Sequence, residues 1–553
     1  MTCINLPLQF QNALVQSREY PRNNIYKAID AYPKSLDKSY VQLGQRELSL
    51  FEESEAQWEI PIRDLNNTCD EHGRVKKRNI HTHDKLLDWL GINVQETSTS
   101  HNAPIVTATK KDPKCRFICL YGIHSRAKLK LTKAMLVDIL TFHQVMPAFL
   151  EFLFIFGQQS EATDMHFAGF HQQVILGNPP DGMVIPELER SGKEYQICYN
   201  LKCAAYIRGS KEDIRLDEWS IRPAVFYHKF DVSNGNTLWI VIKGGLEIQQ
   251  RFKALTDKDA RIQDKSFGTP EECFRSSLSA HLMYCHWATE DWRWYIKWLE
   301  QMVDKENIMA LFGSSEVGSA HKTYTPRDIQ DLQIWEERVR KVIVTLEGNV
   351  DVMISLARFY RQLPQDKGFP LRKSCSLDIG TFSGQIGNFI RDIKMQIKRA
   401  GFLEKTISDR RELVIQHLQS QAASRAEILS RSMEQEQVFM LIITVVTLIF
   451  LPATFVSTFF STDVIKYQGS ESPDGSFSAT AMNRWLQVTI PLTIFTCSAA
   501  YFARQCMLAE RKRNYSGLEQ PPLSWKAKVY NLIYPPTLLP LHKEVSFGDS
   551  GLL

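Results

Sequence analysis

The chain has 553 residues, which is too many for one small core and suggests two to four domains. It carries 66 basic and 62 acidic residues, a net charge of +4, and this mild balance gives no reason to expect nucleic acid as a partner. Hydrophobic residues make up 44%, an ordinary value for a globular protein, so any membrane segments must be few and local.

The N-terminal region, residues 1–110, shows weak periodicity and polar, turn-rich patches, and we expect it to be poorly defined. Its first residues lack the basic start, apolar stretch and cleavage site of a secretory signal. The eleven cysteines are scattered and form no metal-binding pairs of the CxxC type. Reduced thiols in a cytosolic domain are therefore expected.

Residues 111–312 have the pattern of a cytosolic α/β domain. Residues 116–121, RFICLY, predict a buried strand, and a helix is expected from about residue 132 to residue 156. This helix is strongly apolar, but it carries Asp138 and other ionisable groups, which are disfavoured in lipid. We interpret it as a soluble helix with a broad buried face.

Strands and a hairpin are expected in the next part of this domain. Residues 195–207, 220–230 and 237–243 are rich in aromatic and β-branched side chains, which favours strands. The dipeptide Asn234–Gly235 lies between the last two and predicts a hairpin turn. Helical segments resume near residue 271 and continue to about residue 311.

Two helical stretches follow a linker at residues 313–326 and make up the stalk expected over residues 327–437. The second stretch has no proline from residue 380 to residue 437, and its apolar residues recur at helical spacing. One very long helix that enters the membrane is the simplest structure. It needs partners along its length, through coiled-coil packing or oligomerisation. The alternative is two helices with a break at Gly401.

Two uncharged apolar segments predict transmembrane helices at residues 438–460 and 485–503, joined by an outer loop at residues 461–484. At ~1.5 Å per residue, each is long enough to cross a hydrocarbon core of about 30 Å. The chain is therefore expected to be an integral membrane protein, with the lipid bilayer as a partner.

Flanking charges predict the orientation of the two spans. Arg425 and Arg431 precede the first span, and Arg504 and a basic cluster at 511–513 follow the second, whereas the loop between them has few basic residues. The positive-inside rule then places both termini, including the tail at residues 504–553, in the cytosol.

This order of elements resembles the CorA-like metal-ion transporter superfamily. The stretches CRFICLYGIHSRAKLKLTKAMLVDILTFHQVMPAFLEFLFIFG and WSIRPAVFYHKFD…TLWIVIKGG resemble the N-terminal domain of the divergent CorA-like proteins common in fungi, and TLIFLPATFVSTFFSTD resembles the first span of the family. The resemblance implies an α+β cytosolic domain, a long stalk helix and two C-terminal transmembrane helices. It also implies a homo-oligomer, a pentamer in the family, that transports Mg²⁺.

The chain departs from the family at one informative place. In the family, an aromatic residue and a Gly-Met-Asn signature follow the first span and form a ring at the outer mouth of the pore, where oxygens hold hydrated Mg²⁺. This chain has Phe460 followed by Ser461, Thr462 and Asp463. Asp463 still offers oxygen to a hydrated cation, and several copies would attract cations strongly, but the changed ring puts transport in question.

Hydroxyl side chains form a stripe along the first span. Thr447, Thr454 and Ser461 are seven residues apart, and Thr444 and Thr458 belong to the adjacent row. In a ring of helices such a stripe lines a pore, and the alternative is that these hydroxyls bond back to the preceding turn or join helices. The resemblance favours a pore-lining role for Thr444, Thr447, Thr454, Thr458, Ser461, Thr462 and Asp463. Asp463 is also the candidate metal ligand.

Pro452 interrupts the backbone hydrogen bonds of the first span and is the candidate gating hinge. In the cytosolic domain, His281 and Cys285 are spaced to share a metal on one helix, beside His286, but a structural site needs two further ligands that the sequence does not offer. There is no phosphate-binding glycine loop, GxSxG or HExxH, so we expect neither an enzyme nor a cofactor.

Two functions remain open from the sequence. The first is an oligomeric membrane channel or transporter for divalent metal cations, with Mg²⁺ as the transported ion. The second is a membrane-anchored CorA-like sensor or scaffold that has lost ion transport, which the missing Gly-Met-Asn signature suggests.

Overall fold

The computed structural model divides into two compact units, Met1–Gln419 and Ser420–Leu553, and each is described by itself. The residues that the structure describes are 4–27, 32–66, 75–95, 105–159, 166–206, 219–311, 324–461 and 479–515.

A seven-stranded sheet forms the centre of the first unit, in the order β3-β2-β6-β10-β9-β8-β7. Strands β6 and β10 are parallel, and the other neighbouring pairs are antiparallel. The strands are β2 Ile60–Leu65, β3 Val75–Ile80, β6 Cys115–Gly122, β7 Phe170–Ile175, β8 Glu194–Tyr206, β9 Trp219–Asp231 and β10 Thr237–Gly244. A second sheet, β1-β5-β4, comprises Ile4–Asn5, Ile105–Ala108 and Ile92–Gln95.

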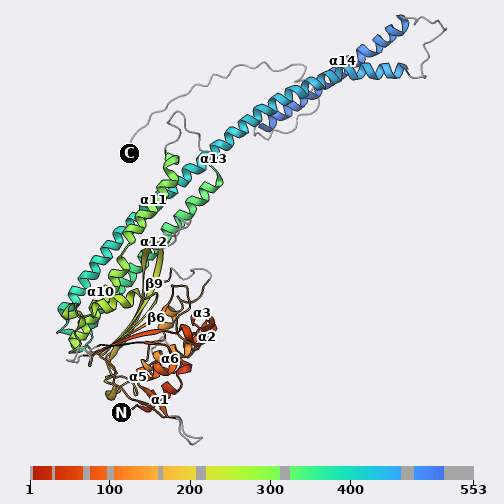
Figure 1. Ribbon diagram of the computed structural model, residues 1–553. Coiled ribbons are helices and arrows are strands. Elements are labelled where there is room, and N and C mark those ends of the chain that lie inside the picture. The colour runs from red at the N-terminus through yellow and green to blue at the C-terminus, as the bar shows by residue number, and fades with distance from the viewer. Residues whose placement is uncertain are drawn as a thin grey trace, which may run out of the picture. The chain divides into compact units, whose positions relative to one another are not determined.

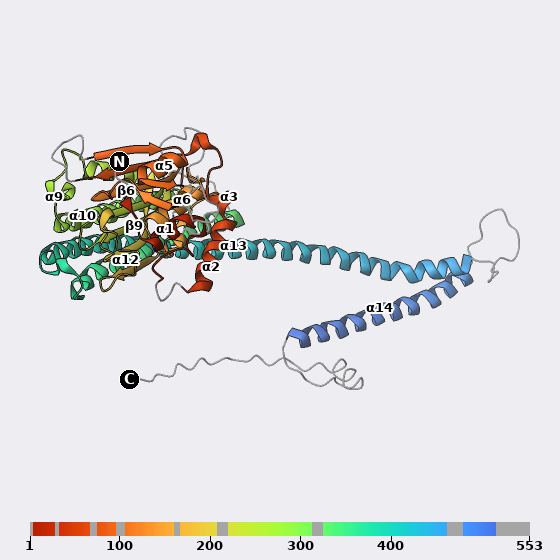
Figure 2. The same ribbon diagram turned by 90° about the horizontal axis from the view of Figure 1, so that it is seen from below.

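Helices cover both faces of the large sheet (Figures 1 and 2). Those before residue 160 are α1 Leu8–Val15, α2 Pro33–Gln45, α3 Glu47–Leu50, α5 His83–Leu90, α6 Lys133–Phe142 and α7 Phe149–Leu153. Those after the sheet are α8 Glu247–Leu255, α9 Ile262–Lys265, α10 Pro270–Thr289, α11 Trp292–Leu311, α12 Pro326–Gln362 and α13 Ser376–Ser461.

Alternate residues of the central strands enter two different hydrophobic cores, as the two-residue period of a strand requires. In β6, Phe117 and Cys119 belong to one core, whereas Ile118 and Leu120 belong to the other. Helices α10 to α12 and the first part of α13 close the first core, and α1, α5, α6 and α7 close the second. Both faces of the sheet are therefore buried.

The sheet takes strands from both sides of the domain boundary expected at residue 110. Strand β2 pairs with β6 in an antiparallel register that sets Ile62 opposite Ile118, and both side chains are buried. The boundary therefore falls inside one folded unit. Neither β2 nor β3 alternates cleanly, since β2 is buried at nearly every position and β3 is mostly exposed, and this gives the weak periodicity.

The helix expected over residues 132–156 is broken into α6 and α7, so that expectation is wrong in part. Gln144 adopts a left-handed backbone conformation with φ 49°, and Pro147 follows without an N–H to donate. Side chains bond the buried backbone groups that have no helical partner, since the Tyr20 hydroxyl donates to the Val145 carbonyl at 3.0 Å and the Met146 N–H donates to Gln196 Oε1 at 2.8 Å.

The hairpin expected at Asn234–Gly235 is present between the antiparallel strands β9 and β10. Gly235 has φ 78°, which glycine adopts without a steric penalty. The Asp231 carboxylate accepts hydrogen bonds from the backbone N–H groups of Ser233 and Asn234, at 3.0 and 2.9 Å. The strands expected near residues 116–121, 195–207, 220–230 and 237–243 are β6, β8, β9 and β10.

The stalk region contains the two long helices that the sequence predicts. Helix α12 begins with a capping box between Thr325 and Asp328 and ends at Gln362, where prolines and short 3₁₀ turns interrupt the helical pattern. Helix α13 is 86 residues long and continues through Gly401, so the alternative of a break there is not observed. The expected linker falls mostly on residues 312–323, which lie outside the described residues.

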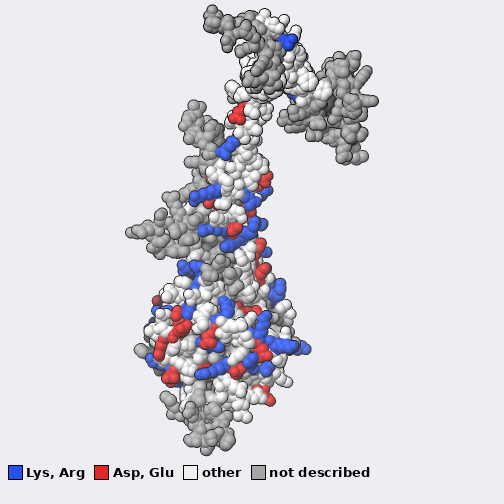
Figure 3. Space-filling view, turned by 90° about the vertical axis from the view of Figure 1, so that its right-hand side faces the viewer, with Lys and Arg blue, Asp and Glu red and all other residues white. Residues whose placement is uncertain are grey.

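The second unit contains the end of α13 and helix α14, Ala479–Tyr515. Two helical segments, Ser376–Phe459 and Met482–Gln505, each contain an apolar window long enough to cross a membrane, and only 6% of each window is buried. A core helix would be mostly buried, so these apolar surfaces are available to lipid or to other copies of the chain. In Figure 3 the described atoms near the top of the view are mostly white, with few charged side chains.

Candidate functional site

The predicted pore-lining hydroxyls that the structure describes all lie on the last part of α13. They are exposed in the single chain. The set is Thr444, Thr447, Thr454, Thr458 and Ser461. The structure therefore brings these five residues onto one helix, but it does not place them in a closed site.

Each of these hydroxyls donates a hydrogen bond to a backbone carbonyl in the preceding turn. Thr447 donates to Ile443 at 2.8 Å, and Thr458 donates to Thr454 at 2.7 Å. The same pattern holds for Thr444, Thr454 and Ser461. The bond uses the only hydrogen of the hydroxyl, so the oxygen presents lone pairs alone to its surroundings. Such an oxygen is an acceptor, which suits a hydrated cation.

The hydroxyl stripe and the two buried positions of the apolar span occupy different faces of α13. Pro452 and Val456 are buried, whereas Thr454 is exposed. At about 100° per residue, Thr447, Thr454 and Ser461 lie roughly 140–180° around the helix from both buried positions. The stripe therefore lies opposite these two buried positions, whereas Ser457, which bonds to α14, lies about 40–60° from Thr454 and Ser461.

Helices α13 and α14 contact each other through a polar bond. The Trp485 indole N–H donates to the Ser457 hydroxyl at 3.1 Å. Buried or half-buried residues of α14, including Thr489 and Thr493, lie further along that helix. Thr493 Oγ1 donates to the Thr489 carbonyl at 2.8 Å, the same local bond as in the stripe. Thr493 therefore offers a chemically matched comparison outside the stripe.

The outer end of the predicted site is only partly described. Ser461 is the last residue of α13, and both Thr462 and Asp463 lie outside the described residues. The acidic residues Glu471 and Asp474 of the expected outer loop also fall outside them. The roles assigned to Thr462 and Asp463 stay predictions.

Pro452 lies inside α13, which continues as helix on both sides of it. A proline has no N–H, so the carbonyl four residues earlier, that of Leu448, has no helical donor. A second proline, Pro491, lies inside α14. The weakened hydrogen bonding at Pro452 makes it the local weak point of the span, and its role as a hinge stays a prediction.

The His281, Cys285 and His286 group does not converge on a shared metal. His281 is fully buried, and its ring nitrogens contact the hydroxyls of Tyr199 and Tyr360 at 2.6 and 2.8 Å. Burial lowers the pKa of His281 well below its ordinary value, so the ring is neutral. His286 instead pairs with Glu290 at 2.9 Å. Within the described ranges, no three His, Cys, Asp or Glu side chains are grouped to hold a metal.

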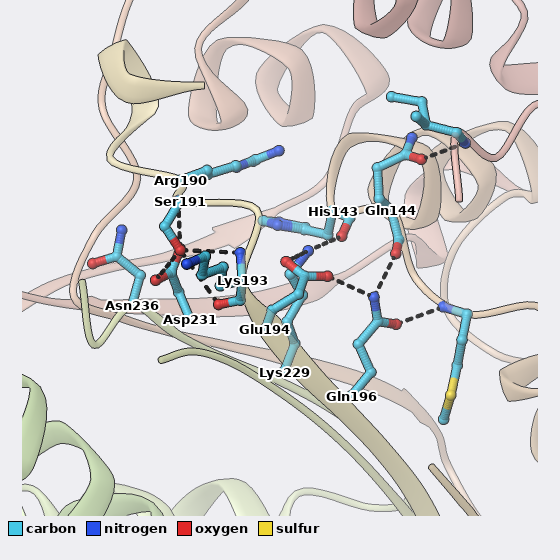
Figure 4. Close-up of polar contacts among 12 residues, drawn as sticks. His143, Gln144, Arg190, Ser191, Lys193, Glu194, Gln196, Lys229, Asp231 and Asn236 are labelled. Atoms are coloured by element: carbon cyan, nitrogen blue, oxygen red, sulfur yellow. Dashed lines mark hydrogen bonds and ion pairs between the residues drawn. The ribbon is translucent and has the colours of Figure 1, made fainter. Parts of the chain in front are cut away.

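A buried polar network joins the end of α6 to strands β8 and β9 (Figure 4). Lys229 pairs with Glu194 at 2.7 Å and also donates to the His143 carbonyl at 3.0 Å. Glu194 accepts from the Gln196 amide at 2.8 Å, and that amide also donates to the Gln144 carbonyl at 3.0 Å. The network therefore supports the irregular turn after α6.

Arginines extend this network around a cavity of about 40 Å³. Arg190 Nε donates to Asp112 at 2.6 Å, and Arg116 binds Asp64 through two nitrogens, each at 2.9 Å. Burial, followed by the charges of Arg116, Arg190 and Lys229, lowers the pKa of His143 well below its ordinary value. The carboxylates of Asp64, Asp112 and Glu194 are already paired with cations, so this network is a structural element rather than a cation site.

Comparison with known proteins gives one family. The family model described as CorA-like transporters matches residues 12–311, which is more than half of the chain. No curated protein matches the sequence.

The solved structures that match this chain share little sequence with it. The complete CorA magnesium transporter from Methanocaldococcus jannaschii is 9% identical, with a TM-score of 0.32, and the match covers 80% of this chain and 96% of that one. The full-length CmaX protein is 11% identical, with a TM-score of 0.30 and coverage of 82% and 100%. The soluble domain of the same CorA is 12% identical, with a TM-score of 0.30 and coverage of 59% and 97%.

Three observations on this chain agree with the family match. The α/β domain that the family model covers carries two cores on one sheet, a long helix follows it, and the second unit contains two candidate spans. By the match over residues 12–311, the protein belongs to the CorA-like transporters, a family of integral membrane transporters rather than enzymes.

Proposed function

We propose that this protein is an oligomeric membrane channel for divalent cations, with Mg²⁺ as its cargo and both termini in the cytosol. The observation that carries the proposal is the hydroxyl stripe, which lies on the face of α13 opposite its buried positions Pro452 and Val456. Several copies of α13 arranged in a ring, as a pentamer, would turn these stripes toward a common axis.

The chemistry of the stripe fits the hydration of Mg²⁺. This ion gives up its water reluctantly and is therefore recognised through its hydration shell. A water on the ion presents hydrogens outward, so its partners must be acceptors. The hydroxyls of Thr447 and Thr454 have already donated their hydrogens to the backbone, and their lone pairs are the groups that such waters bind.

The outer end of the stripe would select and concentrate the cation. Ser461, Thr462 and Asp463 stand where the family has Gly-Met-Asn, so a ring of carboxylates replaces a ring of neutral amides. Five carboxylates attract a divalent cation more strongly than amides do, which favours entry but slows release. Pro452 would serve as the hinge at which the inner part of the span opens.

A specific observation favours a second candidate, a sensor or scaffold without transport. The Gly-Met-Asn signature is replaced at all three positions, at residues 461–463. Binding at a carboxylate ring could be too tight for conduction. In that case the cytosolic unit would act on protein partners, and the helices would serve as an anchor.

Matched substitutions test the proposal in proteoliposomes loaded with a magnesium dye. We expect Thr454→Val to slow Mg²⁺ entry several-fold, because the change removes an acceptor from the stripe while keeping the shape of the side chain. Thr493→Val in α14 makes the same chemical change outside the stripe and is expected to leave entry unchanged.

The carboxylate ring is tested in the same assay. We expect Asp463→Ala to reduce Mg²⁺ entry at low Mg²⁺ concentration more than at saturation, since the ring concentrates the ion. Equal Mg²⁺ entry in wild type, T454V and D463A, at the level of empty liposomes, would contradict the channel function and favour the sensor.

A further inference from the structure

A cavity of about 230 Å³ is lined by residues of helices α1, α5 and α6 in the first unit. These helices lie close together in both views of the chain (Figures 1 and 2). Strands β4 and β5 complete the walls. The cavity lies at the edge of the second hydrophobic core, because Val106, which is only 1% exposed, belongs to that core and also lines the cavity.

Helical periodicity explains why the lining side chains meet. His83 and Leu87 are four residues apart on α5, so they share one face of that helix, and Ala134 and Asp138 share a face of α6 in the same way. The first two residues of the 3₁₀ turn Ser17–Glu19, which follows α1, line the cavity as well. Three segments that are distant in the sequence therefore contribute to one cavity.

Most of the lining is apolar. Six of the ten described lining residues carry an aliphatic side chain, and they are Leu14, Val15, Leu87, Ile92, Val106 and Ala134. A dry cavity of about 150 Å³ with walls of this kind holds a benzene ring. By this comparison, the larger cavity here accommodates a ring with one polar substituent, or a chain of roughly six carbons.

The charged lining residues comprise a matched pair and one further cation. His83 Nε2 lies 2.5 Å from the Asp138 carboxylate, and both residues line the cavity. This hydrogen bond raises the pKa of His83, and the charge of Arg18 opposes the shift, so the guanidinium lies within electrostatic reach of the ring. The Arg18 side chain has no hydrogen bond or ion pair with any residue that the structure describes.

A single arginine beside an apolar cavity matches a carboxylate. The guanidinium binds a carboxylate through two parallel hydrogen bonds, and it is less strongly hydrated than an ammonium. A phosphate ester carries nearly two negative charges, which one cation does not balance. A monocarboxylate with an apolar body therefore fits both the charge and the walls of the cavity.

We propose that this cavity binds a small monocarboxylate with an aromatic or short aliphatic body. Arg18, which is exposed, binds the carboxylate at the mouth, and the aliphatic side chains enclose the body. The proposal does not rest on ion transport, because the site is separate from the hydroxyl stripe of α13 and its occupancy is measured without a membrane gradient.

The test is a binding titration of the full-length protein in detergent, followed by fluorine NMR of the ligand. The probes are 4-fluorobenzoate and 6-fluorohexanoate, and 4-fluorobenzamide is the neutral analogue of the first. Ala134→Leu fills the cavity, and Arg18→Gln removes its unpaired cation. The matched controls, Ala254→Leu and Arg78→Gln, make the same changes at exposed positions outside the cavity.

We expect the wild type and both controls to bind the carboxylate probes with equal affinity, and the amide to bind more weakly. A134L should abolish binding, because its side chain occupies the space of the ligand. R18Q should weaken carboxylate binding about tenfold, because it removes a charge-assisted contact through two hydrogen bonds. Arg18 is exposed, so this variant tests the site without disturbing the core.

Two kinds of result would overturn the proposal. The first is absence of binding of both carboxylates to the wild type, or binding that persists in A134L, which would place the probes in the detergent or elsewhere on the protein. The second is equal affinity in R18Q and R78Q, or an amide that binds the wild type as tightly as the acid, which would exclude recognition of a carboxylate by Arg18.

Discussion

At the scale of single residues, the buried side chains of Arg116 and Asp64 neutralise each other. The side chains of Arg116 and Asp64 are 5% and 9% exposed and form a bidentate ion pair. Such a buried ion pair adds little to the free energy of unfolding compared with two apolar side chains of similar size. Removing one partner, however, leaves the other charge buried without a counter-charge, which is strongly destabilising. The effect of this ion pair on stability is therefore measured by removing one of its two charges.

Breaking that pair gives a stability prediction. We expect Arg116→Met to lower the free energy of unfolding by about 3–5 kcal/mol, and Arg116→Met with Asp64→Leu to recover most of it. Denaturant unfolding followed by tryptophan fluorescence measures both. The exposed pair of Arg22 and Asp37, 2.6 Å apart, is the control, and Arg22→Met should cost less than about 1 kcal/mol. Equal losses in the two cases would contradict this account.

A second pair, between α5 and α6, makes stability depend on pH. His83 Nε2 lies 2.5 Å from the Asp138 carboxylate, and this hydrogen bond raises the pKa of His83 above its ordinary value of 6.5. The protonated ring is therefore favoured in the folded state. The stabilisation is complete below pH 6.5 and is lost as the pH rises through the raised value.

Asp138→Asn should therefore shift the denaturation midpoint downward in acid and much less in alkali. The measurement is the difference in midpoint between wild type and variant at a series of pH values, with His83→Gln as the comparison. A difference that does not change with pH would show that the pair carries no ionic linkage.

Some groups of residues can be found in the sequence and others cannot, for physical reasons. The hydroxyl stripe is readable because its members recur every seven residues on one helix. The buried polar network is not, since Arg116, Arg190 and Lys229 come from separate segments that meet only when the domain folds. The net charge of +4 is a sum over the whole chain, so it does not reveal a local cluster of charged side chains.

At the scale of elements, α13 was predictable and the α6–α7 region was less so. The absence of proline between residues 380 and 437 allows one helix, and apolar residues at helical spacing give it a buried face. The apolar run before residue 156 has the composition of a single helix, but Pro147 and the left-handed Gln144 divide it. The composition of this run alone does not predict where the helix breaks.

Pro452 gives the prediction at this scale. Pro452→Ala restores a backbone donor to the Leu448 carbonyl and stiffens the span, so we expect slower Mg²⁺ entry in proteoliposomes. Pro491→Ala makes the same change in α14 and is the control, with entry expected to stay near that of wild type. Unchanged Mg²⁺ entry in the Pro452 variant would contradict the proposed hinge role of Pro452.

At the scale of the whole molecule, the order of elements was the most informative feature of the sequence. The predicted CorA-like identity is confirmed by the family match over residues 12–311. The boundary at residue 110 was misplaced because β2 and β3 join a sheet whose other strands come much later in the chain. Pairing between distant strands leaves no local signature in the sequence.

The central claim is that this chain conducts Mg²⁺ although Ser461, Thr462 and Asp463 replace the family signature. The most direct measurement is Mg²⁺ entry into proteoliposomes that carry the purified wild-type oligomer, with empty liposomes as the reference and native mass spectrometry to count the 63.7 kDa chains. We expect a pentamer and entry well above the reference. A folded oligomer that admits neither Mg²⁺ nor other divalent cations would contradict the claim and leave a membrane-anchored sensor.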